Sequence, residues 1–441
     1  MSASTSPVAS AGVATPADQH SIRDHNLAVV LQQVAREGAS SRARIASETG
    51  LNKTTVSSLV AELIDRRLLR DGDLQHSGSV GRPARTVELD GDVFVAIGME
   101  VNVGYVAWAI VDLQNRVREH HVTVVDNHAR DARDTLVQVA TQVVDALPAM
   151  RDRGFVPIAA NLAVPGLVDV DRANVLVAPN LGWEGIPAKQ ILTDLFEPDG
   201  LEVLVDNEAN LAALAERLVG VGATIDSFIH VSGEVGVGAG LIVDGRLHRG
   251  ALGFGGELGH MTLDPSGPRC TCGATGCVET YVGLHATLRR AGMDPDDVTA
   301  RARTTDVSPA EQLAAAAEQE HVAAALDETG RLLGTALAMA VNLLSPQAIV
   351  LGGYFTALHP WLAPAVSDEL ARRVLSSRVQ TIDVLPSQLQ LAAAVRGAAA
   401  LTLTGVLDTA TAGTATTATA TAGTVTTATA TTDMATSMAA T

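Results

Sequence analysis

The first part of the chain carries a helical pattern of apolar residues. Residues 24–37 place Leu27, Val30, Leu31 and Val34 at helical spacing, and Gly38 follows at a C-terminal cap position. A second short helix is predicted from Ser41 through residues 45–46, after which Gly50 and Leu51 form a tight turn. The pattern therefore predicts two short helices and a turn that leads into a third helix.

The third helix is predicted to start after Asn52, a good N-cap residue. Its buried stripe contains Val56, Leu59, Val60, Leu63 and Ile64. Its exposed first turns contain Asn52, Lys53, Thr54, Thr55, Ser57 and Ser58. Short polar side chains and one cation at the start of the second helix of a helix-turn-helix are suited to reading the major groove, because that turn points at base edges and phosphates.

Two short strands follow, at residues 68–71 and 86–89, around a tip that contains Gly78, Gly81, Arg82 and Pro83. We interpret this hairpin as the wing of a winged helix-turn-helix, with Arg82 as a candidate for minor-groove or phosphate contact. The predicted DNA-binding domain spans residues 21–90. The alternative is a three-helix packing domain that binds no DNA.

From residue 93 onward the pattern changes to strands alternating with amphipathic helices. Strands are predicted at residues 93–98, 105–112 and 117–125, followed by a helix near 132–147. Later, residues 203–205 lead into a helix at 209–219 in the same alternation. This pattern indicates an α/β domain with mixed sheets, which we place at residues 93–401.

Both ends of the chain lack a pattern that could form a core. Residues 1–20 are rich in Ser, Ala and Pro, without the basic start and apolar run of a secretory signal, so a disordered leader in a cytoplasmic protein is expected. Residues 402–441 are an Ala/Thr-rich segment expected to be disordered. An uncharged stretch at 332–367 is interrupted by polar residues and glycines, which favours a buried helix and strand over a membrane span.

Charge restricts where nucleic acid can bind. The 441 residues suggest two or three domains, and their net charge of −18 excludes DNA binding over the whole surface. Residues 21–85 hold ten basic residues against seven acidic ones, a local excess in an acidic chain. Any contact with DNA is therefore expected in this segment.

The three cysteines of the chain lie within eight residues, as Cys270, Cys272 and Cys277, and His260 precedes the first by ten. Three thiolates and one imidazole form a tetrahedral zinc set, and the intervening glycines allow sharp turns. An odd number of cysteines in a cytoplasmic protein disfavours a disulfide framework. Four protein ligands predict a structural Zn²⁺; free thiols in a loop are the alternative.

Three strings together resemble the ROK family, which includes bacterial sugar-responsive repressors and sugar kinases of the actin and hexokinase fold. They are VDNEANLAALAE at 205–216, SGEVGVGAGLIVDGRLHRGALGFGGELGH at 232–260, and the cysteine string that ends at Glu279. The resemblance covers about residues 93–401, and the upstream helix-turn-helix matches the repressor branch. It implies a two-lobed, hexokinase-like α/β domain.

The resemblance also implies a set of sugar-binding residues. These are Asn207, Glu208, Glu257, His260 and Glu279, with Asn180 of the PNLGW string as a weaker addition. Carboxylates and an amide form paired hydrogen bonds with vicinal hydroxyls, and a ligand without those hydroxyls leaves them unpaired. In the family the histidine is also a zinc ligand, which gives His260 two roles. The alternative is that the glutamates are solvated surface charges.

Phosphoryl transfer needs a phosphate cradle and a base, and both differ from the kinases of the family. Where those kinases have an Asp followed by a glycine-threonine turn, this chain has Glu100, Asn102 and Val103. A β-branched side chain at Val103 obstructs a backbone cradle. The base position carries Glu208, one methylene longer than the kinase aspartate, which displaces its carboxylate by about an ångström.

The sequence therefore predicts a sugar-responsive transcription regulator, a repressor of carbohydrate genes without kinase activity. Its expected partners are a DNA operator, a sugar effector and a second copy of the chain, because paired half-sites supply specificity. The rival hypothesis is an ATP-dependent hexose kinase that has acquired a helix-turn-helix.

Overall fold

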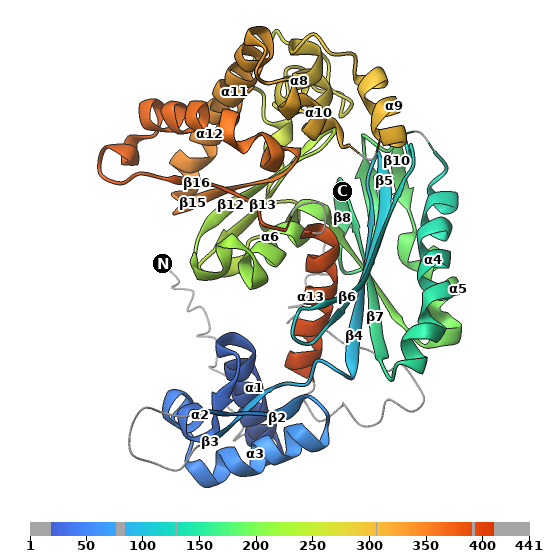
Figure 1. Cartoon of the computed structure of the whole chain (residues 1–441), viewed down its shortest axis with the longest axis vertical. Coiled ribbons are helices and arrows are strands. Elements are labelled where there is room, and N and C mark those ends of the chain that lie inside the picture. Colours follow the sequence, from blue (N-terminus) through green and yellow to red (C-terminus); the bar gives the residue numbers. More distant parts are fainter. Residues whose placement is uncertain (1–18, 76–83, 129, 306, 390–392, 410–441) are drawn as a thin grey trace, which may run out of the picture.

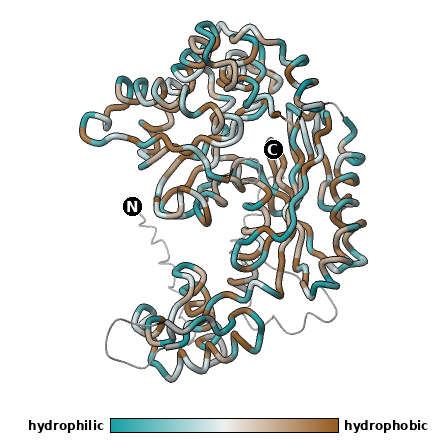
Figure 2. Tube along the Cα trace, viewed as in Figure 1, coloured by the Kyte–Doolittle hydropathy of each residue, from teal (hydrophilic) through white to brown (hydrophobic). Residues whose placement is uncertain are grey.

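The computed structural model describes residues 19–75, 84–128, 130–305, 307–389 and 393–409. They form a small N-terminal domain and two larger lobes, with a helix near the C-terminus running from between the lobes toward the small domain (Figure 1). In the tube of Figure 2, apolar residues concentrate on the inner strands and polar residues on the outer helices. One cluster of buried residues joins the small domain to the first lobe and to the helix near the C-terminus.

The small domain is a winged helix-turn-helix. Its helices are α1 (Gln19–Glu37), α2 (Arg42–Thr49) and α3 (Lys53–Asp65), and its strands β1 (Ser40–Ser41), β2 (Leu69–Gln75) and β3 (Ala84–Leu89) form a sheet in the order β1-β3-β2. Ser41 and Asn52 cap α2 and α3, and Gly50 adopts a positive φ between them. These ends agree with the predicted caps. Arg82 and the other tip residues lie outside the described residues.

The first lobe is built on a five-stranded sheet in the order β11-β7-β4-β5-β6. Its strands are β4 (Phe94–Val101), β5 (Tyr105–Asp112), β6 (Val117–Val124), β7 (Val156–Val164) and β11 (Glu202–Asn207). Helices α4 (Ala132–Asp152) and α5 (Ala188–Phe196) cover one face, and β8 (Leu167–Asp169), β9 (Asn174–Ala178) and β10 (Trp183–Ile186) form a small second sheet. Strand β11 runs parallel to β7, so the carboxyl ends of both point toward the second lobe.

The second lobe has a five-stranded sheet in the order β14-β13-β12-β15-β16. Its strands are β12 (Phe228–Gly233), β13 (Val237–Val243), β14 (Arg246–Leu247), β15 (Ala348–Gly353) and β16 (Asp383–Pro386). Its helices are α7 (Glu279–Val282), α8 (Leu284–Arg290), α9 (Pro295–Thr305), α10 (Pro309–Ala315), α11 (Glu320–Leu344) and α12 (Tyr354–Arg373), with short 3-10 turns at Val221–Thr224, Leu258–His260 and Leu375–Arg378.

The uncharged stretch at 332–367 forms the end of α11, then β15, then most of α12. The expected buried helix followed by a buried strand is therefore correct. Within the described part of the chain, no helix has both the length and the apolar character that crossing a membrane requires.

Two helices connect the parts. Helix α6 (Glu208–Val219) follows β11, and α13 (Ala393–Thr409) packs against it through small side chains. The approach is close: a methyl group added at Gly397 would lie 1.8 Å from the carbonyl oxygen of Leu211, and one at Gly98 would lie 1.9 Å from that of Val395. Only glycine at 98 and 397 permits this packing.

Two expected boundaries need correction. Helix α1 already begins at Gln19, so the last two residues assigned to the leader are helical. Helix α13 continues through Thr409, past the expected start of the disordered tail at 402. Leu403 and Leu407 are buried there, in the same cluster as the core of the small domain. The Ala/Thr-rich composition hid a helix that packs through a few large residues.

Candidate functional site

One cavity between the two lobes brings together side chains from distant parts of the sequence. All six residues predicted to contact sugar line it: Asn180, Asn207, Glu208, Glu257, His260 and Glu279. Gly166, Asn102 and Val103 also line it, as does Glu234, which the sequence analysis did not single out. The structure thus places the predicted residues at a single site. Trp183 of the same PNLGW string as Asn180 does not line the cavity; it is buried and donates its indole N–H to the carbonyl oxygen of Arg130.

Asn207 and Glu208 stand where β11 meets α6. The side-chain oxygen of Asn207 caps the helix by accepting from the backbone N–H of Asn210 at 3.0 Å, and its amide donates to the carbonyl oxygen of Gly166 at 2.9 Å. Asn207 is therefore held rigidly, and Glu208 begins the helix with its carboxylate in the cavity wall. Burial raises the pKa of Glu208 to about 8, and the nearby Glu100 adds to the shift.

The turn after β4 is tied to Glu208. Asn102 donates from its side-chain amide to Oε2 of Glu208 at 2.9 Å, and its own side-chain oxygen accepts from the backbone N–H of Val103 at 2.7 Å. Tyr105 donates its hydroxyl to Oε1 of Glu100 at 2.6 Å. Burial raises the pKa of Glu100 to about 7, and its Oε2 has no hydrogen-bond partner among the described residues. In place of an open turn, this segment holds a buried polar network.

The opposite wall of the cavity is joined to the cysteine loop. Asn180 donates to Oε2 of Glu279 at 3.4 Å, and Thr271 donates its hydroxyl to the side-chain oxygen of Asn180 at 2.9 Å. Glu257 lies 4.0 Å from Nε2 of His260, and burial raises the pKa of Glu257. The positions of the hydrogen-bond acceptors on this wall are therefore set in part by contacts with the loop that carries the cysteines.

The candidate metal centre consists of His260, Cys270, Cys272 and Cys277, whose ligand atoms all lie within 4.8 Å of one another. Nδ1 of His260 is 3.8 Å from Sγ of Cys270, and the sulfurs of Cys272 and Cys277 are 3.7 Å apart. Gly273 and Gly276 have φ of 94° and 72°, so they make the turns that bring the thiols together. The donor set fits a metal that prefers soft ligands.

Cys270 lies against a carboxyl group of the cavity wall. Its thiol is 2.8 Å from Oε1 of Glu279, and burial together with that hydrogen bond raises the pKa of the thiol. A bound metal reverses this tendency, because a coordinating thiol loses its proton. His260 presents Nδ1 to Cys270 and Nε2 toward Glu257.

The candidate DNA-reading surface is the N-terminal part of α3. Asn52 accepts from the backbone N–H of Thr55 at 2.8 Å, and the hydroxyl of Ser57 donates to the carbonyl oxygen of Lys53 at 2.9 Å. Lys53, Thr54 and Ser58 are exposed, as are Asn52 and Ser57, and Thr55 is half-buried. Several arginines of the domain are paired with acids, including Arg23, Arg42, Arg44 and Arg70. Lys53 has no ion pair within the described ranges.

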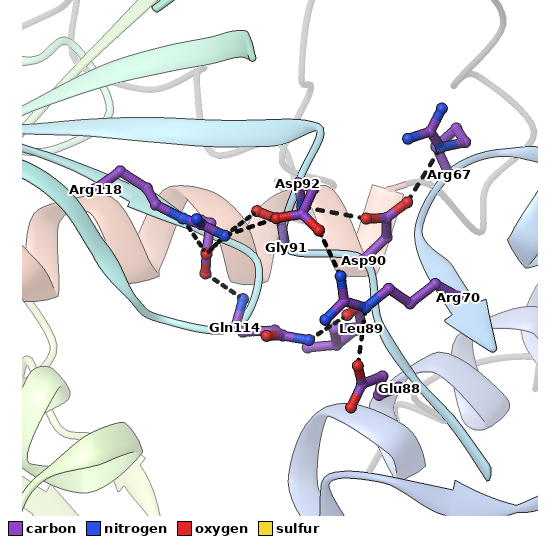
Figure 3. A network of polar contacts seen from close by, with 10 residues as sticks. Arg67, Arg70, Glu88, Leu89, Asp90, Gly91, Asp92, Gln114 and Arg118 are labelled. Carbon is purple, nitrogen blue, oxygen red and sulfur yellow. Dashed lines mark hydrogen bonds and ion pairs between the residues drawn. The ribbon is translucent and has the colours of Figure 1, made fainter. Parts of the chain in front are cut away.

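The small domain is joined to the first lobe by a chain of ion pairs. In Figure 3, Asp92 lies between an arginine of β2 and an arginine of β6. Arg70 is 2.5 Å from Oδ2 of Asp92, and Arg118 is 3.0 Å from Oδ1 of Asp92 and 2.6 Å from the buried Asp112. The linker is thus held by ion pairs from the small domain on one side and from the first lobe on the other.

The fold and the cavity define a two-lobed protein of the actin and hexokinase class that carries an N-terminal winged helix-turn-helix. The chain belongs to the ROK family, which it matches over residues 96–404. The expected family and fold are confirmed.

Repressors are among the proteins that match this chain over most of its length. The xylose repressor of Bacillus subtilis (strain 168) is 29% identical over 399 residues, covering 89% of this chain and 98% of its own. The DNA-binding transcriptional dual regulator NagC of Escherichia coli (strain K12) is 28% identical over 391 residues, covering 88% and 94%. Both matches cover a larger share of the chain than the family model, which begins at residue 96.

Solved structures give the same picture. A ROK family transcriptional regulator, described as a homologue of the E. coli MLC protein, matches with a TM-score of 0.71 and 26% identity, covering 89% of this chain and 98% of that one. A ROK family glucokinase from Streptomyces griseus, in complex with glucose and AMPPNP, matches with a TM-score of 0.58 and 27% identity, covering 70% and 98%. The glucokinase match leaves a larger part of this chain uncovered than the regulator match does.

Proposed function

We propose that this protein is a sugar-responsive transcription regulator that acts in the cytoplasm as a repressor of carbohydrate genes. The observation that carries the proposal is the continuous packing from the cavity to the small domain. A cavity lined by hydroxyl-binding groups begins at Glu208, and α6 and α13 connect it to the core of the winged helix-turn-helix.

The connection has three steps. Glu208 is the first residue of α6, so a sugar that binds its side chain contacts the start of that helix directly. Leu211, Ala212 and Ala215 of α6 pack against α13. The other side of α13 packs into the core of the small domain and contacts α1. A sugar that prefers one arrangement of the lobes therefore shifts the orientation of the small domain, by no more than its difference in affinity for the two arrangements.

In this proposal DNA is read by the surface of α3, with Asn52, Lys53, Thr54, Thr55, Ser57 and Ser58 facing the major groove, and Arg82 of the wing contacting the minor groove or phosphates. Two copies of the chain bind two half-sites of an operator, since one small domain offers few contacts. The change in small-domain orientation alters the match to those half-sites.

In the same proposal Zn²⁺ fills the cluster of His260, Cys270, Cys272 and Cys277. Four protein ligands leave no open position, so the ion is structural. Its contribution is to fix the loop that places Glu257 and Glu279, and to hold His260 with Nε2 toward the sugar. Asn180, Asn207 and Glu208 complete the set of sugar contacts.

A sugar kinase is the second candidate, favoured by the similar glucokinase and by a buried carboxylate at the base position. Three features oppose it. The amide of Asn102 occupies one oxygen of Glu208, the side chain of Val103 lies in the cavity wall, and in the described part of the chain no lysine or arginine lines that cavity. A transferred phosphoryl group needs cationic partners, and this wall supplies none.

One experiment separates the two candidates. An operator is selected from random duplexes with the full-length protein, and its affinity is measured by fluorescence anisotropy with pentoses, hexoses and amino sugars. The same samples are assayed with ATP and Mg²⁺ for phosphorylated sugar. Operator binding that one sugar alters without turnover supports the regulator. Turnover that disappears in Glu208→Gln overturns it.

A further inference from the structure

Glu234 is a carboxylate in the cavity wall for which the sugar-binding role assigns no task. It follows β12 directly, with its backbone N–H donating to the carbonyl oxygen of Gly236 at 2.9 Å and its carbonyl accepting from the backbone N–H of Leu284 at 3.0 Å. These bonds fix the residue beside Asn102, Val103 and Glu208 in the lining of the cavity. The backbone of Glu234 is therefore held in place by hydrogen bonds at the end of β12.

The carboxylate of Glu234 also lies at the beginning of α12. Gly233 and Gly353 are paired in the parallel register of β12 and β15, and α12 starts at the next residue, Tyr354. A methyl group added at Gly353 would lie 2.9 Å from Oε1 of Glu234, which places that oxygen next to the helix start. The first turn of α12 contains no acidic residue and no side-chain cap.

The start of a helix attracts negative charge, because its first backbone N–H groups lack partners and its dipole is positive there. A phosphate that entered the cavity would find its most favourable place at such a helix end. Glu234 already brings an acidic group of the chain itself to this place. Burial raises the pKa of Glu234 well above its usual range, with Glu208 and Glu100 adding to the shift, so at neutral pH the side chain occupies the helix start as a neutral acid.

The rest of the cavity offers an anion no compensation. Four glutamates line it, Glu208, Glu234, Glu257 and Glu279, and among its described lining residues there is no lysine or arginine. Arg249, on the loop after β14, is committed to a two-bond ion pair with the buried Asp206. A phosphate loses its hydration on entering and gains no cation, which is costly. The hydroxyl groups of a neutral sugar, by contrast, can form hydrogen bonds with these glutamates.

We propose that Glu234 is a specificity-determining residue that reserves the cavity for sugars without a phosphate or carboxylate group. This inference rests on the proposed function, since it concerns the ligand of the same site. In physical terms, the chain fills the anion position at the start of α12 with its own acid, so the effector is a free sugar taken up before any phosphorylation.

The test is isothermal titration of the full-length protein with free aldoses, the same aldoses as phosphates, and inorganic phosphate. The free sugar that binds best is expected to bind at least about tenfold more tightly than its phosphate. In Glu234→Ser this ratio is expected to fall roughly tenfold, because the helix start becomes available to the phosphate. Glu184→Gln, an exposed glutamate on β10, is the control and leaves the ratio unchanged.

Each outcome decides something different. A wild-type protein that binds a sugar phosphate as tightly as the free sugar overturns the inference, and so does a folded Glu234→Ser variant that keeps the wild-type ratio. If Glu234→Ser does not fold, Glu234→Ala removes the same carboxyl group, and the wild-type ratio still decides the preference. If no sugar binds in any form, the proposed function fails, and the inference fails with it.

Discussion

The side-chain amide of Asn102 donates to Oε2 of Glu208 at 2.9 Å, and this hydrogen bond joins the turn after β4 to the start of α6. The two residues are 106 positions apart in the chain. Because this donor satisfies a buried carboxyl group, the two residues act together.

Replacing Asn102 with Ala is expected to weaken binding of the effector sugar by about 1–3 kcal/mol, because the carboxyl group of Glu208 loses the hydrogen bond that holds it in the cavity wall. Titration calorimetry on the folded variant measures this change. Tyr105→Phe is the comparison, because it removes the donor to Glu100 and leaves the amide of Asn102 in place. Equal losses in both variants would contradict the specific role of Asn102.

The buried carboxyls predict that stability depends on pH. The pKa of Glu100 is raised to about 7 and that of Glu208 to about 8 by burial, above the value of about 4.3 for an exposed glutamate. A raised pKa in the folded state contributes stability that is complete below the unfolded value and is lost as the pH rises through the folded value. Melting temperatures measured from pH 5 to pH 9 should therefore fall. Glu100→Gln should flatten the curve, whereas Glu184→Gln should leave it as in the wild type.

Removing the metal is expected to abolish the sugar response without unfolding the small domain. The cluster fixes the loop between Glu257 and Glu279, and the core that the winged helix-turn-helix shares with α13 and the first lobe contains no residue of that loop. Elemental analysis should find one Zn²⁺ per chain, which a strong chelator or Cys272→Ser removes. Ser266→Ala, an exposed change in the same loop, should keep both metal and response. A sugar response that persists after complete metal removal would refute the structural role of the ion.

Lys53 is expected to contribute a phosphate contact. Lys53→Ala should weaken binding to operator and unrelated duplexes alike, and should reduce the slope of log affinity against log salt by about 1. Lys189→Ala changes the only other lysine of the chain, on α5, and should leave both quantities unchanged. An operator-specific loss would instead assign Lys53 to a base.

Leu403 links the last helix to the small domain. Its side chain is buried in the cluster that contains Leu27, Val30 and Leu31 of α1, so Leu403→Ala should destabilise the protein by about 2–5 kcal/mol. It should also reduce the change in operator affinity that sugar produces. Thr404→Ala, at the exposed neighbouring position, should preserve both. Truncation after Thr409 should behave as wild type, because α13 is then complete.

Much of the small domain could be predicted because its signals are local. Ser41, Gly50 and Asn52 each mark a helix end through their own side chain or backbone preference, and the structure has those ends. The six cavity residues were predicted through short strings, and the structure brings them together although they come from both lobes. A short motif fixes local geometry, and the family fold supplies the rest.

The features that could not be predicted depend on tertiary packing. The helix at 402–409 is stabilised by contacts of Leu403 and Leu407 with a domain that lies more than 300 residues earlier, and composition alone made it resemble a disordered tail. Glu234 stands in a glycine-rich string whose glycines are explained by tight turns, and only the pairing of Gly233 with Gly353 places it beside α12. The spacing of apolar residues along the sequence does not predict this pairing.

Because α13 completes the core of the N-terminal domain, the order of synthesis matters. Helices α1 to α3 leave the ribosome first, whereas Leu403 and Leu407 follow both lobes in the chain, so the core of the small domain stays incomplete until the lobes have been made. A polypeptide that stops before α13 therefore lacks part of the core of its small domain. Under the proposed function, the fold itself thus limits truncated products that would occupy operators and never respond to sugar.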